Sequence, residues 1–439
     1  MKLKGLRKKN LFLFSLPSII SSIFEPLASL VDTSLIGKLS TNSLASFALA
    51  ATLFNSITWI FNFIVHASTQ GVAEYSSSRN PTLLKQRIKI SLIISFLCGI
   101  LCSALFILLK DYLFSTVGGI PSQQGEFDEY FIPRAIFHLF TILSLTTLSI
   151  LRGLSKLKLV LNLMIFSIFT NILFSYLFLY PLEMGIRGAA LGTIIAHSST
   201  FLISFFFLLK YKKIGLGLLK VTVWKENWLK FGRNSKDLFI RSLLLTSCFF
   251  ISTRLASHIG VSSLGAHQVL LQVWLFSSFF LDGFAISGNI LGARYFFGRQ
   301  YQRTRIIYTY LVELSLIIGF IFTFSYWIFW DQIIGLFTND LLVKEKIVTI
   351  KPVIILSQVI SSLAFIFDGL IFGIDGFDWL RKHMLYGFLF IFLPMAFYTQ
   401  YQSSILWIWL GLTGLNVYRS VTGYIYVKRK VWKNQHVIS

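Results

Sequence analysis

The sequence predicts an all-α integral membrane protein with twelve transmembrane helices in two pseudo-symmetric six-helix lobes. Apolar runs of about 20 residues, long enough to cross a bilayer, recur along the chain. Charged residues make up only 13% of the chain, whereas a soluble protein carries about 25%. The mean hydropathy is +0.71. Continuous apolar runs without strict alternation favour helices over a barrel as the way to satisfy backbone groups in lipid.

Hydropathy and loop composition place the twelve expected spans along the chain. They lie near residues 11–36, 43–73, 88–114, 131–151, 157–181, 186–210, 237–260, 264–293, 306–330, 347–374, 383–399 and 404–427. No segment between them is long enough for a soluble domain of ordinary size.

The basic residues predict an orientation in the membrane. The net charge of +22 is concentrated at the two ends of the chain and in the loops around residues 79–89, 152–158, 210–236, 294–305 and 381–382. The alternate loops and span ends hold fewer basic residues, namely Lys38, Lys110, Arg134, Arg187, Lys344, Lys346 and Lys351. By the positive-inside rule, both termini are cytoplasmic in a bacterial inner membrane. This distribution makes nucleic acid an unnecessary partner.

The two halves of the chain repeat one another. SLASFALAATLF (43–54) opens the second span in the way that SLGAHQVLLQVW (263–274) opens the eighth. Between the halves, residues 211–236 mix Lys with Leu, Trp224 and Trp228, a composition typical of an amphipathic segment at the membrane interface. We therefore expect an N-lobe over 1–210, a cytoplasmic linker over 211–236 and a C-lobe over 237–439, an internal duplication typical of transporters.

Ionisable residues inside spans are the first functional candidates, because charge in a bilayer is costly. Asp32 lies in the first span, and Asp282 and Asp368 lie in the eighth and tenth. A carboxylate held away from water takes up a proton more readily. With amide and hydroxyl oxygens nearby it holds Na⁺ instead, and each of these acids could also serve only as a hydrogen-bonding partner between helices.

Three further residues inside spans have open interpretations. Pro17 removes a backbone hydrogen bond from the first span, so it is either a bend point or a proline tolerated near a helix start. Arg254 and Arg419 lie in the seventh and twelfth spans, where each either extends to an interface or balances an acid.

Several segments resemble the multidrug and toxic compound extrusion (MATE) transporters. The stretch 16–49 with its VDT motif is similar to the family's first span, and 252–299 with LDGFA resembles the DNA-damage-inducible-protein-F-like branch. Further similarity lies in IFDGLIFGIDG (366–376), in NILFSYLFL (171–179) and in GIRGAALGTIIA (185–196). Together these segments cover nearly the whole chain.

The resemblance implies two six-helix lobes, a central cavity and efflux of amphipathic, often cationic compounds driven by H⁺ or Na⁺. It implies that Asp32 binds the coupling ion, which is either H⁺ or Na⁺, and that Asn171 and Thr193 are the polar neighbours of Asp32. It makes Pro17 the bend of the first span. Many members have a second acid four residues after the asparagine, where this chain has Ser175.

The absence of that second acid from the motif gives more weight to Asp32 alone, or to the C-lobe. Candidates for the C-lobe cavity are Asp282, Asp368 and Arg254.

The leading functional hypothesis is an antiporter that works by alternating access, as a monomer among membrane lipids, on a small-molecule substrate and without a cofactor. A flippase for lipid-linked or polysaccharide precursors is the alternative, which a large cationic cavity would favour. The sequence contains neither a DDxxD-like acid cluster nor an HExxH motif, so a membrane-embedded enzyme is not expected. A channel is a further alternative, but the duplicated lobes favour alternating access.

Overall fold

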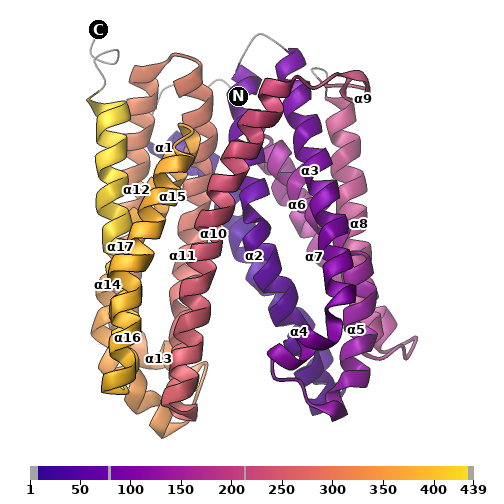
Figure 1. Cartoon of the computed structure of the whole chain (residues 1–439), viewed down its shortest axis with the longest axis vertical. Coiled ribbons are helices and arrows are strands. Elements are labelled where there is room, and N and C mark those ends of the chain that lie inside the picture. Colours follow the sequence, from indigo (N-terminus) through magenta and orange to yellow (C-terminus); the bar gives the residue numbers. More distant parts are fainter. Residues whose placement is uncertain (1–7, 78–80, 212–213, 434–439) are drawn as a thin grey trace. The chain divides into compact units, whose positions relative to one another are not determined.

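The computed structural model describes residues 8–77, 81–211 and 214–433, without the side chains of residues 25–30, Thr41 and Leu219. Throughout these ranges the ordered elements are helices, and none of the described residues forms a strand (Figure 1).

The described residues of the first half form nine α-helices and one 3₁₀ turn. They are α1 (Lys8–Gly37), α2 (Thr41–Ser77), α3 (Pro81–Leu108), α4 (Lys110–Thr116), η1 (Pro121–Gln123), α5 (Gln124–Ile136), α6 (His138–Gly153), α7 (Leu157–Leu179), α8 (Ile186–Lys210) and α9 (Gly217–Lys220).

In the second half, the residues up to Lys433 form eight α-helices and two π-helical turns. They are α10 (Lys225–Ile259), α11 (Val261–Phe297), α12 (Tyr301–Ile328), α13 (Trp330–Gly335), α14 (Leu341–Gly373), α15 (Phe377–Gly387), η2 (Phe388–Phe392), α16 (Leu393–Gln402), α17 (Ile405–Val427) and η3 (Lys428–Trp432).

The described helices account for the twelve predicted spans. Nine are long and apolar enough to cross a membrane when α15, η2 and α16 count as one, and the bent pair α5 and α6 makes a tenth. Helices α1 and α17, of 30 and 23 residues, are long enough for the remaining two at 1.5 Å per residue. The predicted fold class is confirmed. The sequence repeat is also visible in helix length, since α2 and α11 each have 37 residues.

Two spans are less regular than hydropathy alone predicts. The expected span 131–151 is bent by 50° at Phe137, between α5 and α6. Pro133 lies inside α5 and has no N–H to donate, which weakens the helix at this point. In the eleventh span Pro394 likewise lacks an N–H, and the preceding Leu393 N–H bonds to Phe388 O, five residues back.

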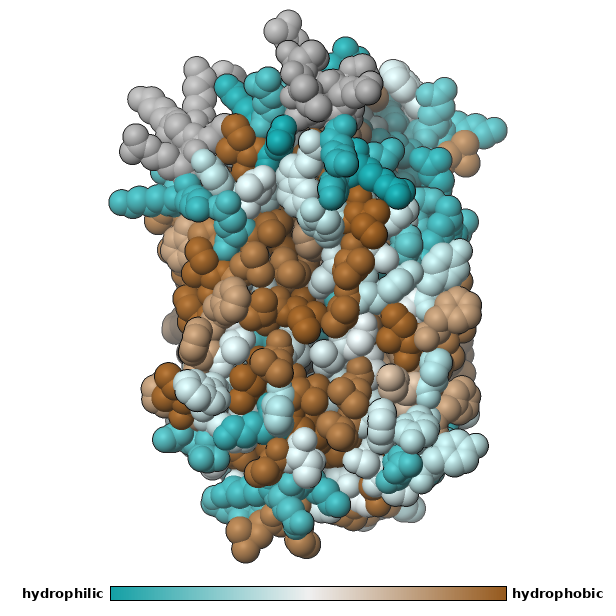
Figure 2. All heavy atoms as spheres, turned by 90° about the vertical axis from the view of Figure 1, so that its left-hand side faces the viewer, coloured by the Kyte–Doolittle hydropathy of each residue, from teal (hydrophilic) through white to brown (hydrophobic). Residues whose placement is uncertain are grey.

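The surface is apolar where a bilayer would contact it. On the face drawn in Figure 2, hydrophobic residues form a band with hydrophilic residues at both ends. Exposed side chains of α12, η2 and α16 include Phe320, Phe324, Trp327, Phe390 and Phe397. Large exposed apolar patches of this kind mark a surface that is covered by another medium, which for this protein is lipid.

The described residues divide into two compact units. The N unit is Ile23–Ser235, and the C unit comprises the described residues up to Ser22 together with those from Lys236 onward. Helices α1 and α10 therefore each contribute to both units. The lobe boundaries proposed from the sequence stay a prediction.

Each unit has its own hydrophobic core. The N unit packs one cluster around Phe54 and Phe131 and another around Ile88 and Leu208. The C unit packs α11, α14 and α17 around Trp409.

Candidate functional site

Helices α7 and α8 of the N unit approach closely at Gly192. A Cβ atom at this position would lie 2.6 Å from the backbone nitrogen of Ser175, closer than real side chains allow. Only glycine permits this spacing, which brings the polar residues of the two helices together. Asn171 Nδ2 consequently donates to Thr193 Oγ1 at 3.1 Å. Both residues are buried.

Asp32 on α1 completes this polar cluster. Its side chain interacts with Asn171. Asp32 Oδ1 is buried and accepts no hydrogen bond from any described residue, and the same holds for Asn171 Oδ1 and Ser175 Oγ. The N-unit cluster, defined here as Asp32, Asn171, Ser175 and Thr193, thus retains unused acceptor capacity. The structure brings together the four residues that the sequence proposed for the coupling ion.

Two residues on α5 adjoin the N-unit cluster, and the sequence had not pointed to either. Arg134 Nη1 donates to Tyr130 Oη at 2.7 Å, and its guanidinium lies 4.5 Å from the centre of the Phe54 ring. Arg134 also interacts electrostatically with Asp32, and Tyr130 contacts Thr193. The i, i+4 spacing of a tyrosine and an arginine on one helix was the available signal.

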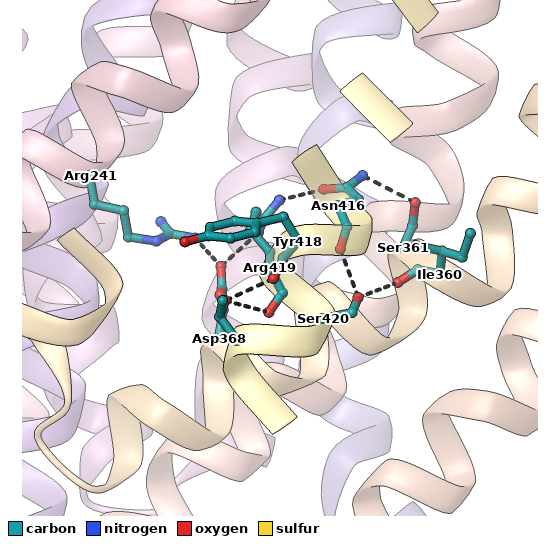
Figure 3. A network of polar contacts seen from close by, with 9 residues as sticks. Arg241, Ile360, Ser361, Asp368, Asn416, Tyr418, Arg419 and Ser420 are labelled. Atoms are coloured by element: carbon teal, nitrogen blue, oxygen red, sulfur yellow. Dashed lines mark hydrogen bonds and ion pairs between the residues drawn. The ribbon is translucent and has the colours of Figure 1, made fainter. Parts of the chain in front are cut away.

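The C unit buries a different arrangement around Asp368 on α14. Arg241 from α10 and Arg419 from α17 both donate to Asp368 Oδ2, the latter at 2.6 Å (Figure 3). Arg241 is 8% exposed, Arg419 is 6% exposed and Asp368 is 5% exposed. We call these three residues the C-unit cluster.

A chain of hydrogen bonds extends from the C-unit cluster. Arg419 Nη1 donates to Asn416 Oδ1 at 2.7 Å, and Asn416 Nδ2 donates to Ser361 Oγ at 3.3 Å (Figure 3). Trp274 Nε1 donates to the same serine oxygen at 3.2 Å. Helices α10, α11, α14 and α17 are therefore linked through one buried network.

The remaining sequence candidates lie outside these two clusters. Arg254 is exposed on α10, whereas Arg241, at the start of the same predicted span, is buried. Asp282 is half-buried on α11, next to Gly283, where α11 contacts the backbone of Ile19 on α1. Pro17 is buried in α1, and its carbonyl accepts from Ser21 Oγ at 2.7 Å.

The two clusters differ in what they can bind. The N-unit cluster offers one carboxylate with amide and hydroxyl oxygens, a donor set that suits a proton or a hard monovalent cation. In the C-unit cluster the carboxylate is already occupied by two guanidinium groups. No group of three or more His, Cys, Asp or Glu residues that could hold a metal ion occurs among the described residues.

Comparisons with known proteins agree with this fold. The family model described as MatE matches residues 17–177 and 238–399. Protein DETOXIFICATION 45, chloroplastic, from Arabidopsis thaliana is 26% identical over 97% of this chain and 79% of its own length. DNA damage-inducible protein F from Escherichia coli (strain K12) is 25% identical over 97% of this chain and 93% of its own.

A solved structure is also similar throughout its length. The crystal structure of MATE in the bent conformation aligns with a TM-score of 0.89 at 17% identity, covering 97% of this chain and 96% of that one. At this identity the similarity concerns the fold alone.

Proposed function

Because the chain belongs to the MatE family, whose members are multidrug and toxin extrusion transporters, we propose that it is a cation-coupled antiporter. In this proposal it exports small amphipathic or cationic organic compounds by alternating access, driven by H⁺ or Na⁺. It acts as a monomer in a bacterial inner membrane with both termini cytoplasmic. Family and fold are those of membrane transporters rather than of enzymes.

The observation that supports cation coupling is the unsatisfied carboxylate of Asp32. Its Oδ1 atom is buried and accepts no hydrogen bond from a described residue. A buried acceptor without a partner costs about 1–3 kcal/mol, so uptake of a cation at this oxygen is favourable. Asn171 Oδ1 and Ser175 Oγ, buried and likewise unsatisfied, add two further oxygens.

Coupling requires that the cation bind more strongly to one transport state than to the other. A ligand that binds both states equally shifts no equilibrium, however tightly it binds. In our proposal, cation binding at Asp32 favours the state that releases substrate outside, and loss of the cation inside restores the state that binds substrate.

A flippase for lipid-linked or polysaccharide precursors is the second candidate function. A large cationic cavity would favour this function, and from the sequence Arg254 and Arg419 were the basic residues placed well inside spans. The structure instead buries Arg241 beside Arg419. A buried arginine pair is suited to phosphate groups, so this pair favours the second candidate more than the sequence did.

Flux in proteoliposomes tests the antiporter proposal. Purified protein is reconstituted, H⁺ and Na⁺ gradients are imposed separately, and movement of ethidium, a fluorescent organic cation, is followed. We expect flux with one gradient, and its loss in Asp32→Asn, because an amide can neither carry a proton at this oxygen nor neutralise Na⁺. Asp331→Asn, at an exposed acid on α13, is the control and should transport normally. Gradient-independent flux in the wild type, or undiminished flux in Asp32→Asn, would refute the proposal.

A further inference from the structure

The C-unit cluster carries an unbalanced positive charge. It contains two guanidinium groups and one carboxylate, all at least nine-tenths buried. Asp237 lies one helical turn before Arg241 on α10, but it is already paired with Arg381 at 3.2 Å. The Asp237–Arg381 pair is neutral, so this pair and the C-unit cluster together carry a formal charge of +1.

A net charge inside the membrane-spanning part of a protein is costly unless something pairs with it. Removal of a charge from water costs several kcal/mol even after the protein relaxes. The surplus guanidinium charge in the C unit therefore favours binding of a ligand from outside the protein. The ligand that balances it is an anion.

The donors of the C-unit cluster are also incompletely used. Both arginines donate to the same oxygen of Asp368, so neither forms the two parallel bonds that a guanidinium can make with an oxyanion. Arg419 Nε is buried and donates to no described acceptor, and Trp379 Nε1 is in the same situation. Two unpartnered N–H groups thus accompany the unbalanced charge.

Small cavities lie on two sides of Arg419. One borders both arginines and the carboxylate of Asp368, and its lining also includes Trp379, His383, Thr422, Gly423 and the apolar residues Leu380 and Met384. The other is lined by Phe249, Trp274, Leu245, Leu412 and Leu415 next to Arg419 and Asn416, so it is mainly apolar. Each cavity has room for about one water molecule, so a ligand with a charged head and an apolar body requires the side chains around Arg419 to move apart.

We propose that the C-unit cluster binds the oxyanion of an amphipathic substrate, either a carboxylate or a phosphate. The oxyanion accepts hydrogen bonds from Arg241, Arg419 and Trp379, and the apolar part of the substrate packs against Phe249 and Trp274. The C-unit cluster would then add amphipathic organic acids or acidic lipids to the cationic compounds of the proposed function. This assignment deepens the proposed function and rests on it for the transport cycle, but binding at the cluster does not require cation coupling.

Equilibrium binding tests the assignment without any gradient. The full-length protein is placed in phosphatidylcholine nanodiscs, and binding of radiolabelled 4-phenylbutyrate is compared with that of 4-phenylbutylamine, which has the same apolar body and the opposite charge. We expect the acid to bind and the amine to bind at least about tenfold more weakly, because loss of one charge-assisted hydrogen bond alone has this effect. This comparison uses the wild type and depends on no variant.

Charge variants locate the site. Arg241→Gln removes the surplus charge but leaves the Arg419–Asp368 pair intact, so the protein should fold while binding of the acid weakens by about 10- to 100-fold. Arg241→Lys keeps the charge and should retain most of the binding. Arg254→Gln removes an exposed arginine from the same helix and should bind as the wild type does.

Nanodiscs containing phosphatidic acid separate the two sources of the oxyanion. Competition by this lipid assigns the site to a lipid phosphate, and competition by added inorganic phosphate or carboxylate alone assigns it to a soluble acid. Equal binding of acid and amine, or unchanged binding in Arg241→Gln, overturns the assignment. Asp32→Asn changes the balance between the transport states and so shifts both affinities together, but the preference for the acid over the amine should persist, so failure of the coupling proposal can be distinguished from failure of this one.

Discussion

The N unit and the C unit each place an aspartate among their helices, half-buried for Asp32 and buried for Asp368, and the two carboxylates have different surroundings. Asp32 interacts electrostatically with Arg134, but one of its oxygens accepts no hydrogen bond from a described residue, and amide and hydroxyl groups lie nearby. Asp368 receives two guanidinium groups on one oxygen. The residue type alone therefore does not define the role of an intramembrane acid. In our proposals, the unused acceptor capacity of Asp32 favours binding of a cation, and the surplus of donors around Asp368 favours binding of an anion.

The contacts that fix the positions of the side chains also differ between the two clusters. In the N unit, the close approach of α7 and α8 at Gly192 sets the positions of Asn171 and Ser175. In the C unit, ion pairs and hydrogen bonds connect α10, α11, α14 and α17. We expect the first cluster to be sensitive to backbone spacing and the second to removal of charge.

The largest effect that separates the two clusters is on stability. Asp368→Asn leaves two buried guanidinium groups without their carboxylate and should lower the free energy of unfolding by about 3–5 kcal/mol. Asp32→Asn removes a carboxylate with an unused oxygen and should change it by about 1 kcal/mol or less. Unfolding in mixed micelles, followed by circular dichroism, measures both values. Equal costs would show that Asp32 is as firmly paired as Asp368 and would remove the distinction.

Much of the fold and of the N-unit cluster was predictable from the sequence. Continuous apolar runs locate spans because lipid excludes unpaired backbone groups. The first-span motif and the segments around Asn171 and Thr193 pointed to residues that the structure brings together. Such local patterns suffice where each helix contributes one recognisable polar residue.

Local sequence patterns could not predict the C-unit cluster, and the reason is physical. Arg241 follows a linker rich in lysine, and hydropathy does not show whether a basic residue near a span end turns inward or toward the interface. Its pairing depends on α10, α14 and α17, whose contributing residues Arg241, Asp368 and Arg419 are far apart in the chain. Arg254 was the more obvious candidate from its depth in the span, yet it is exposed.

A second prediction concerns the backbone spacing of the N unit. Gly192→Ala places a methyl group against the backbone of Ser175, so α7 and α8 must separate, at a cost of about 1–3 kcal/mol. The Asn171–Thr193 hydrogen bond should lengthen, and cation-driven flux should fall together with stability. Gly125→Ala, where a Cβ atom meets open space, is the matched control and should be neutral or slightly stabilising. Normal flux in Gly192→Ala would show that this spacing does not position the cluster.

The smallest effect is expected for an ion pair near the ends of the spans. Its contribution to the free energy of unfolding is a reference for the contribution of the buried pairs. Lys110 Nζ lies 2.6 Å from Asp128 Oδ2, and the two side chains are 20% and 27% exposed. The hydrogen bond from Lys110 to Asp128 raises the pKa of the lysine above its ordinary value. Because partly exposed pairs are screened by water, Lys110→Met should cost about 1 kcal/mol or less.

The pH dependence of this cost has a defined sign. The pKa of Lys110 is higher in the folded protein than in the unfolded chain, so the pair contributes fully below the unfolded pKa of about 10.4. Its contribution is lost as the pH rises through the raised folded value. The difference in unfolding free energy between wild type and Lys110→Met should therefore be constant near neutral pH and shrink above pH ~11. The substitution Lys346→Met, at an exposed lysine of α14, should show no such trend. A cost for Lys110→Met that matched Asp368→Asn would mean that burial does not distinguish these pairs, and the contrast between the two aspartates would then need another cause.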